Sequence, residues 1–217
     1  MKRILVTGPT GYIGGRLVPR LLAAGHTVRV LARHPADLEG RPWTGSAEVV
    51  RGDVFCGEGL AEAMEGVDAA YYLVHSMSDT PNFEAYEETS ARNFALAARE
   101  AGVRRVMYLG GLGADAAALS HHLRSRHRVG AIMREHGLNV TEFRAAIIVG
   151  SGSVSFEMIR YLVERLPFIP CFLYLRDTRC QPVAIRDVLS YLVAALDTPA
   201  SEGRTIEIGG SAVHTYR

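Results

Sequence analysis

The stretch Val6-Thr7-Gly8-Pro9-Thr10-Gly11-Tyr12-Ile13-Gly14 decides the fold of this 217-residue chain. An apolar run of strand length, residues 3–7, precedes the three glycines Gly8, Gly11 and Gly14, and a helical pattern of apolar residues follows them. Gly8 permits a sharp turn, Gly11 lets a phosphate approach the backbone, and Gly14 lets a helix lie close to a strand. The helix N-terminus then offers free N–H groups and a positive dipole end to an anion. The stretch therefore predicts a pyrophosphate site for NAD(P) at Gly8, Thr10, Gly11, Tyr12, Ile13 and Gly14, the alternative being a tight glycine turn without a ligand.

Short β-rich runs alternate with longer helical stretches along the rest of the chain, which is typical of βαβ units. The expected strands are residues 3–7, 27–32, 47–51, 69–74, 105–109, 140–144 and 205–208. The expected helices are residues 11–24, 59–65, 83–101, 117–135, 154–165 and 185–196, and four of them end at Gly25, Gly66, Gly102 and Gly137. The pattern predicts the α/β class, with one doubly wound, mostly parallel, seven-stranded Rossmann-type sheet.

The domain organisation expected from this pattern is a single NAD(P)-binding Rossmann domain over residues 1–217. Residues 151–180 interrupt the alternation with a proline-containing segment and are expected to form a small C-terminal lobe over the strand ends, where substrates bind in such folds. Aromatic residues in this lobe suit an apolar substrate or a protein interface equally well: Phe156, Tyr161, Phe168, Phe172 and Tyr174. The chain stops just after the last expected strand, so a longer parent protein stays open.

Bulk composition excludes several classes of function. The net charge of +1 and the sequence pI near 7.8 provide no global field for nucleic acid or an anionic membrane. We expect no secretory signal and no membrane-spanning run. Three cysteines at unrelated spacings, Cys56, Cys171 and Cys180, indicate reduced thiols and a cytoplasmic location. No two of the histidines on the fourth expected helix are four residues apart, so we expect no metal site.

Two positions after later strands indicate how the adenosine half of the cofactor is bound. An NAD site usually has an acidic residue at the end of the second strand, but this chain has Arg33 followed by His34. An arginine there suits the 2′-phosphate of NADP, so NADP is favoured and NAD remains open. The alternative is that Arg33 is a solvated strand-end residue. Asp53-Val54 after the third strand suits the adenine edge, although Asp53 could equally be a turn acid that caps the next helix.

The glycine spacing, the Gly52-Asp53-Val54 segment and the order of elements resemble the short-chain dehydrogenase/reductase superfamily from Met1 to about Gly210. A typical member has a serine after the fifth strand and Tyr-x-x-x-Lys on the next helix, which together transfer a proton. This chain cannot have that motif because Lys2 is its only lysine. Glycines, beginning with Gly110, stand where the serine is expected. The usual dehydrogenase mechanism is therefore excluded.

The fourth expected helix resembles an atypical subgroup of the superfamily that has His-x-x-x-Arg in place of Tyr-x-x-x-Lys. His122 and Arg126 are four residues apart and share one helical face. The resemblance implies that His122 exchanges a proton with substrate and that Arg126 holds a ribose or phosphate oxygen. The alternative is a solvated basic face. The resemblance also implies cofactor contacts after the fourth, fifth and sixth strands, at Val74, His75, Gly110 and Ala145, and a homodimer.

Two functions compete at this point. The first is an NADP(H)-dependent oxidoreductase or epimerase-like enzyme for a small carbonyl or hydroxyl substrate that the sequence does not identify. The second is a redox sensor or scaffold protein that binds NAD(P) without turnover. Joint loss of the serine, tyrosine and lysine favours the second, whereas the intact glycine motif and the basic pair favour the first.

Overall fold

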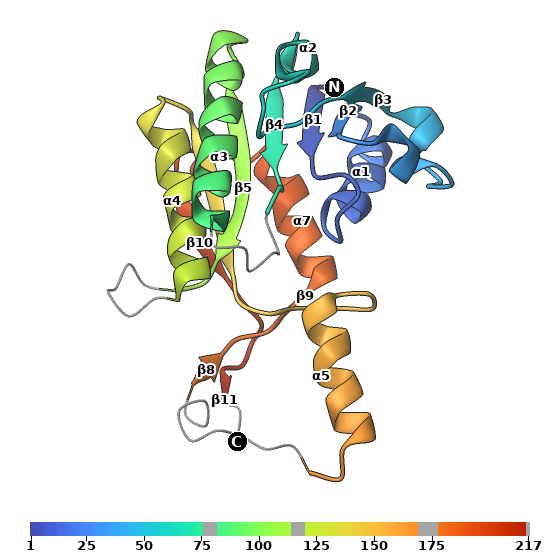
Figure 1. Cartoon of the computed structure of the whole chain (residues 1–217), viewed down its shortest axis with the longest axis vertical. Helices are drawn as coiled ribbons and strands as arrows, with labels where there is room; N and C mark the ends of the chain where they lie inside the picture. The colour runs from blue at the N-terminus through green and yellow to red at the C-terminus, as the bar shows by residue number, and fades with distance from the viewer. Residues whose placement is uncertain (76–81, 114–119, 169–177, 216–217) are drawn as a thin grey trace.

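The computed structural model describes residues 1–75, 82–113, 120–168 and 178–215 (Figure 1). Seven strands form a single sheet in the order β10-β6-β5-β4-β1-β2-β3, and all six neighbouring pairs are parallel. The strands are β1 (Arg3–Thr7), β2 (Thr27–Ala32), β3 (Glu48–Arg51), β4 (Ala69–Tyr72), β5 (Arg105–Gly111), β6 (Val140–Ala145) and β10 (Thr205–Ile208). This sheet confirms the predicted doubly wound α/β architecture.

Helices cover both faces of the sheet. Those in the described residues that pack on it are α1 (Gly14–Ala23), α2 (Leu60–Met64), α3 (Phe83–Glu100), α4 (His121–Glu135) and α7 (Ile185–Ala195), while α5 (Val154–Arg165) lies away from it. One buried cluster joins α1 and α7 to one face of the sheet, and a second joins α2, α3 and α4 to the other. Three short 3₁₀ helices that the sequence did not predict are Pro35–Leu38, Thr44–Ser46 and Pro199–Ser201.

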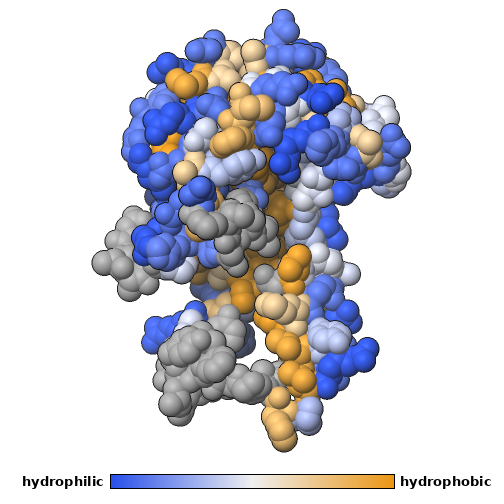
Figure 2. Space-filling model, viewed as in Figure 1, coloured by the Kyte–Doolittle hydropathy of each residue, from blue (hydrophilic) through white to orange (hydrophobic). Residues whose placement is uncertain are grey.

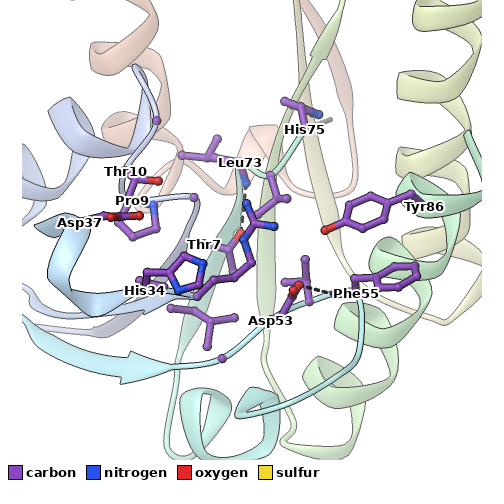
Figure 3. Close-up of a pocket in the computed structure, with 18 of the residues that line it drawn as sticks. Thr7, Pro9, Thr10, His34, Asp37, Asp53, Phe55, Leu73, His75 and Tyr86 are labelled. Atoms are coloured by element: carbon purple, nitrogen blue, oxygen red, sulfur yellow. Dashed lines mark hydrogen bonds between the residues drawn. The ribbon is translucent and has the colours of Figure 1, made fainter. Parts of the chain in front are cut away.

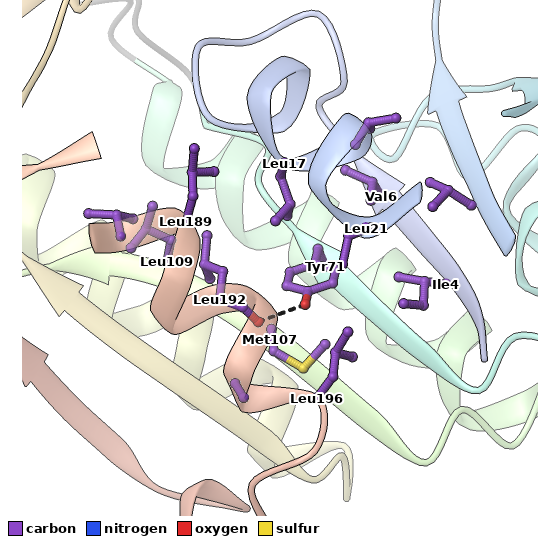
Figure 4. Close-up of a cluster of buried hydrophobic side chains, with 14 of the residues drawn as sticks. Ile4, Val6, Leu17, Leu21, Tyr71, Met107, Leu109, Leu189, Leu192 and Leu196 are labelled. Atoms are coloured by element: carbon purple, nitrogen blue, oxygen red, sulfur yellow. Dashed lines mark hydrogen bonds between the residues drawn. The ribbon is translucent and has the colours of Figure 1, made fainter. Parts of the chain in front are cut away.

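The central strands β1, β4 and β5 are buried and mostly apolar because both faces of the sheet are covered there, whereas the edge strands β3 and β10 carry exposed polar residues. Ile4 and Val6 belong to the cluster with α1 and α7, whereas Leu5 between them belongs to the opposite cluster. Each of these side chains is completely buried, and burial of one such side chain contributes roughly 1.5–3 kcal/mol. Tyr71 also lies on the α7 face and donates its hydroxyl to the backbone oxygen of Leu192 at 2.7 Å (Figure 4). The buried polar atom is thereby satisfied inside the core.

The first helix begins at Gly14, three residues after its predicted start. The backbone N–H of Gly11 donates to the oxygen of Gly8 at 3.2 Å, so residues 8–11 close a turn before helical bonding begins. Pro19 lies inside α1 and cannot donate to the oxygen of Gly15. Trp43 donates its indole N–H to that oxygen at 3.1 Å, so the helix tolerates the proline at that point.

The segment after β6 extends beyond the end of the sheet (Figure 1). It contains α5, a parallel pair of β7 (Ile148–Val149) with β9 (Val183–Ala184), and an antiparallel pair of β8 (Arg179–Cys180) with β11 (His214–Thr215). Apolar side chains of α5 lie at the surface (Figure 2). Tyr161 on this helix is 61% exposed, and Phe168, just beyond its end, is 82% exposed. Cys171, Phe172 and Tyr174, which the sequence analysis named, lie outside the described residues. The division into one domain with a lobe at residues 151–180 stays a prediction.

Replacing Gly14 with alanine tests the contact between α1 and the turn. A Cβ atom at Gly14 would lie 2.2 Å from the backbone oxygen of Gly8, so helix and turn must separate. We expect Gly14→Ala to lower the free energy of unfolding by roughly 1–3 kcal/mol, measured by urea denaturation. Gly45→Ala is the matched control, because a Cβ atom there meets nothing within 4 Å. Equal stability of the two variants would contradict the packing argument.

Candidate functional site

A pocket of about 1030 Å³ opens at the carboxyl ends of β1 to β4. β1 lies between β2 and β4, so the strand order reverses at this point, which is where ligands bind in doubly wound sheets. The lining comes from the glycine turn, from the loops after β2, β3 and β4, and from the start of α3: residues 7–11, 31–34, 37, 52–55, 73–75, 82, 85, 86 and 89. In Figure 3, Thr7 and Leu73 lie in the middle of this pocket, between His34 on one side and Tyr86 on the other.

The glycine turn forms one wall through backbone atoms. Gly8 has a φ of 71°, and a Cβ atom on it would lie 2.7 Å from the backbone oxygen of Leu73, which follows β4. The hydroxyl of Thr7 donates to the oxygen of Tyr71 at 3.1 Å and accepts the N–H of Leu73 at 3.3 Å. These bonds hold the ends of β1 and β4 together, so glycine is the residue that fits between them.

The start of α1 has the features of an anion site. The backbone N–H groups of Tyr12 and Ile13 make no backbone hydrogen bond within the described part of the chain. Ile13 is the N-cap residue and provides no side-chain cap, and the first turn contains no acidic residue. These two N–H groups and the positive end of the helix dipole can therefore bind a negatively charged group. The Tyr12 side chain itself packs on Arg16, whose guanidinium lies 4.1 Å from the ring centroid, and does not line the pocket.

The loop after β2 brings two basic residues and one acidic residue to the pocket. Arg33 and His34, which the sequence analysis named, directly follow β2, are exposed and line the pocket. Asp37, which the sequence analysis did not single out, also lines it from the 3₁₀ helix Pro35–Leu38. Pro35 begins this helix. A proline at that position is a sequence signal for a helical turn after β2, which could have predicted that the loop folds back near Thr10.

The loop after β3 forms the opposite wall. Asp53 accepts the backbone N–H of Phe55 at 2.8 Å, so its carboxylate closes a turn and does not cap α2, whose N-cap residue is Gly59. Phe55 stacks on Tyr86 of α3, with ring centroids 4.4 Å apart and an interplanar angle of 14°. Partial burial, followed by the negative charge of Asp53, raises the pKa of the Tyr86 hydroxyl. The wall therefore combines a flat aromatic surface with a carboxylate and a hydroxyl donor, which suits a nucleotide base.

Sequence reasoning missed the contribution of α3 to this wall. Asn82, the adjacent pair Ala85 and Tyr86, and Thr89 line the pocket, and the pair is three or four residues from each of the other two, so all share one side of the helix start. That spacing was a signal in the sequence, but it does not show which cavity the helix faces.

The loop after β4 places His75 at the edge of the pocket with 16% of its side chain exposed. Its Nε2 lies 3.0 Å from the oxygen of Leu109 and must donate, since a carbonyl only accepts. Its Nδ1 lies 3.9 Å from a carboxylate oxygen of Glu87, a buried residue. Burial and then the positive charge of Arg126 lower the pKa of His75 to about 3, against the raising effect of the bond to Leu109. His75 is therefore a neutral imidazole at physiological pH.

The predicted basic pair on α4 lies outside the pocket lining. His122 is exposed and stacks on Phe83, with ring centroids 4.7 Å apart. Arg126 is half-buried, and its Cδ lies against Gly111 at the end of β5. Its charge acts on the pKa of both His75 and Tyr108, so the guanidinium faces the ends of β4 and β5. The structure thus brings Arg126, but not His122, toward the predicted contact His75.

Packing explains why glycine occupies the end of β5. A Cβ atom at Gly110 would lie 3.2 Å from Oε1 of Glu142, which is fully buried. That carboxylate accepts 2.8 Å bonds from Nε of Arg144 and from a guanidinium nitrogen of Arg134. A side chain in this place would meet that carboxylate at close range, so Glu142 and the two arginines that fix it would have to shift by a few tenths of an ångström. Ala145, at the end of β6, is buried and does not line the pocket.

Two kinds of site are not found in the described ranges. Residues 1–75, 82–113, 120–168 and 178–215 contain no cluster of three His, Cys, Asp or Glu side chains that could hold a metal ion. No helix in those ranges has the length and apolarity needed to cross a bilayer.

Replacing His75 with glutamine tests its neutral state through the pH dependence of stability. Between the unfolded pKa of 6.5 and the folded value near 3, the unfolded chain binds more protons, so stability falls as pH falls through this window. Glutamine keeps a donor for Leu109 but does not titrate. We expect wild type to lose about 2 kcal/mol more unfolding free energy than His75→Gln between pH 7 and pH 5, by urea denaturation. An identical loss in both proteins would show that His75 titrates normally.

Comparison with known proteins agrees with this geometry. The (4-alkanoyl-5-oxo-2,5-dihydrofuran-3-yl)methyl phosphate reductase of Streptomyces griseus subsp. griseus is 30% identical over 221 residues, which cover 99% of this chain and 70% of that protein. The 3-beta-hydroxysteroid dehydrogenase of Mycolicibacterium neoaurum is 34% identical over 116 residues, or 49% of this chain and 31% of that protein. The chain therefore matches about a third of the length of that dehydrogenase.

Solved structures show the same fold. The triphenylmethane reductase of Citrobacter sp., complexed with NADP(H), superposes with a TM-score of 0.80 at 21% sequence identity, covering 99% of this chain and 72% of that one. A profile of the NAD(P)H-binding family matches residues 8–154, more than half of the chain. The glycine turn, the seven-stranded parallel sheet and these matches together establish that the chain belongs to the NAD(P)H-binding family and has its Rossmann-type fold.

Proposed function

We propose that the protein is an NADP(H)-dependent oxidoreductase that reduces a small carbonyl substrate. The observation that carries the proposal is the pocket at the ends of β1 to β4, with the glycine turn on one wall and the Phe55–Tyr86 stack on another. A reductase that is 30% identical over nearly the whole chain supports reduction over other chemistry of the family.

The loop after β2 supports NADP over NAD. Arg33 and His34 leave the strand at the point where the adenosine ribose lies in Rossmann folds, and both line the pocket. A guanidinium binds a phosphate through two parallel hydrogen bonds. Asp37 is the carboxylate in this loop that could instead accept ribose hydroxyls. It lies four residues beyond Arg33, in the 3₁₀ helix, and we assign the 2′-phosphate to Arg33 because it is adjacent to the strand end.

The His-x-x-x-Arg spacing on α4 supports a proton-transfer role. NADPH, when bound, would supply the hydride for the substrate carbon, and a protein group would supply the proton for the substrate oxygen. His122 carries an imidazole, the side chain most often used as a general acid. Arg126, one turn later, carries a fixed charge toward the ends of β4 and β5. In this proposal Arg126 holds a cofactor oxygen and His122 is the acid.

Binding without turnover is the competing function. It is favoured by glycine at position 110, where typical family members have serine and where a Cβ atom would crowd the buried carboxylate of Glu142. His122 also stacks on Phe83 and lies outside the pocket lining. The two functions differ in one measurable property, which is whether NADPH is oxidised.

Replacing Arg33 with alanine tests the cofactor preference. Loss of a charge-assisted bond to phosphate is worth about 1.5–3 kcal/mol, so we expect the Kd for NADPH to rise about tenfold or more. The Kd for NADH should change less than about twofold, because it has no 2′-phosphate. Both constants are measured by calorimetry on the folded protein.

Asp37→Asn is the matched variant for this test. If Asp37 holds the ribose hydroxyls, this change weakens NADH binding while Arg33→Ala does not discriminate between the two cofactors. That result would overturn the assignment of NADP. Failure of both cofactors to bind wild type would overturn the proposed function itself.

Replacing His122 with glutamine tests turnover. A panel of carbonyl and quinone compounds is mixed with NADPH, and the loss of absorbance is followed for wild type and variant. Removal of a general acid costs about 100-fold or more in kcat, so we expect at least that loss for His122→Gln. His121→Gln is the control, since His121 is exposed and contacts Glu84 at 3.2 Å.

Two outcomes contradict this part of the proposal. Full activity of His122→Gln would remove His122 from the mechanism. Tight NADPH binding by wild type with no turnover of any compound in the panel would favour the sensor or scaffold function.

A further inference from the structure

A second pocket of about 650 Å³ lies on the face of the protein formed by α1 and α7. It shares no lining residue with the cofactor pocket. Its walls come from the outer side of α1, the loop before β3 and the start of α7: Gly15, Arg16, Pro19, Arg20, residues 39–43, Ile185, Arg186 and Leu189. Neither the family match nor the proposed function accounts for it.

The lining of this second pocket is strongly basic. Arg16, Arg20, Arg41 and Arg186 line it, against a single carboxylate from Glu39. The charges of four guanidinium groups around one concave surface add to a positive potential, and water screens them less in a recess than on a flat surface. The groups therefore repel one another. A ligand with a negative group removes that repulsion.

Two of these guanidinium groups are fixed without being neutralised. Arg16 donates to the backbone oxygens of Tyr12 at 3.2 Å and Ser151 at 2.9 Å. Arg41 donates to the backbone oxygen of Thr10 at 2.9 Å. Carbonyl acceptors orient a guanidinium but leave its positive charge in place, and each group retains further N–H donors. These two arginines are therefore set in position for an anion.

The other two arginines are more exposed. Arg186 approaches the carboxylate of Asp187 at 3.4 Å with 79% of its side chain exposed, a weak surface pair. Arg20 is exposed on the last turn of α1. Both can turn toward a ligand at little cost in packing.

Apolar surface lies beside the charges. Trp43 is 5% exposed and is fixed by its indole bond to Gly15. Pro19, Pro42, Ile185 and Leu189 complete the apolar part of the wall. An inorganic anion leaves this apolar surface exposed to water, whereas an anion attached to a flat apolar body removes it from water, which is favourable.

We propose that this second pocket binds a small molecule with a phosphate or carboxylate group on a flat apolar body, such as an aryl phosphate. The arginines hold the anion, and the more exposed apolar lining at Pro19, Pro42 and Ile185, above the buried Trp43, holds the apolar body. The site is separate from the proposed oxidoreductase site and does not depend on it.

Trp43 makes the test direct, because it is the only tryptophan in the chain and lines this pocket. Phenyl phosphate is titrated into the full chain without cofactor while tryptophan fluorescence is followed. We expect a saturable change, with weaker binding of inorganic phosphate and of benzyl alcohol, which each have half of the chemistry. Affinity should fall with added salt.

Charge removal locates the ligand. We expect Arg20→Gln/Arg186→Gln to raise the Kd for phenyl phosphate about tenfold or more, the loss for two charged donors. Arg92→Gln/Arg99→Gln removes the same charge from exposed positions on α3 and should leave the Kd unchanged within about twofold. Circular dichroism and urea denaturation confirm that both variants are folded.

Three outcomes overturn the proposal. They are no saturable signal with phenyl phosphate, equal affinity of wild type and Arg20→Gln/Arg186→Gln, and loss of phenyl phosphate binding in the presence of saturating NADP⁺ or in Arg33→Ala. The last would place the anion in the cofactor pocket. Because the readout needs no cofactor, failure of NADPH to bind leaves this test intact.

Discussion

The close approach of three backbone segments at the glycine turn is the constraint on which the rest of the structure depends. A side-chain carbon at Gly14 would lie 2.2 Å from the oxygen of Gly8, and one at Gly8 would lie 2.7 Å from the oxygen of Leu73. Only glycine lets β1, β4 and the start of α1 meet in this way. The N–H groups of Tyr12 and Ile13 follow this contact directly and make no backbone hydrogen bond within the described residues, so the packing that builds the fold also leaves donors at the start of α1.

The sheet and its helices could be predicted because each depends on a local signal. Both faces of the sheet are covered, so the central strands β1, β4 and β5 are mostly apolar, and helices end at glycines such as Gly25 and Gly102 with positive φ. The residues on the pocket wall were less predictable. Asp37, Phe55 and Tyr86 are recognised only when the loops are folded against one another. Their positions depend on tertiary contacts such as the Phe55–Tyr86 stack, for which a single sequence gives no distance.

Buried charge was the hardest feature to predict. Glu142 lies in β6 between Thr141 and Phe143, and its side chain can be fully buried because Arg144 and Arg134 donate to it. Gly110 and Gly130 leave room for the carboxylate, since a Cβ atom at either would approach one of its oxygens. Removing one partner of such a network leaves an uncompensated charge in the core. The glycine after β5, interpreted from sequence as a lost serine, thus has a structural reason of its own.

This packing has an evolutionary consequence. A Cβ atom at Gly110 would lie 3.2 Å from Oε1 of Glu142, so a side chain there obliges a carboxylate held by two arginines to shift by a few tenths of an ångström. Residues in contact are not independent in their effects on stability, so a substitution at Gly110 is coupled to Glu142, Arg134 and Arg144. Mutational paths to new chemistry that pass through this position therefore depend on its neighbours, whereas paths through exposed pocket residues such as Arg33 do not.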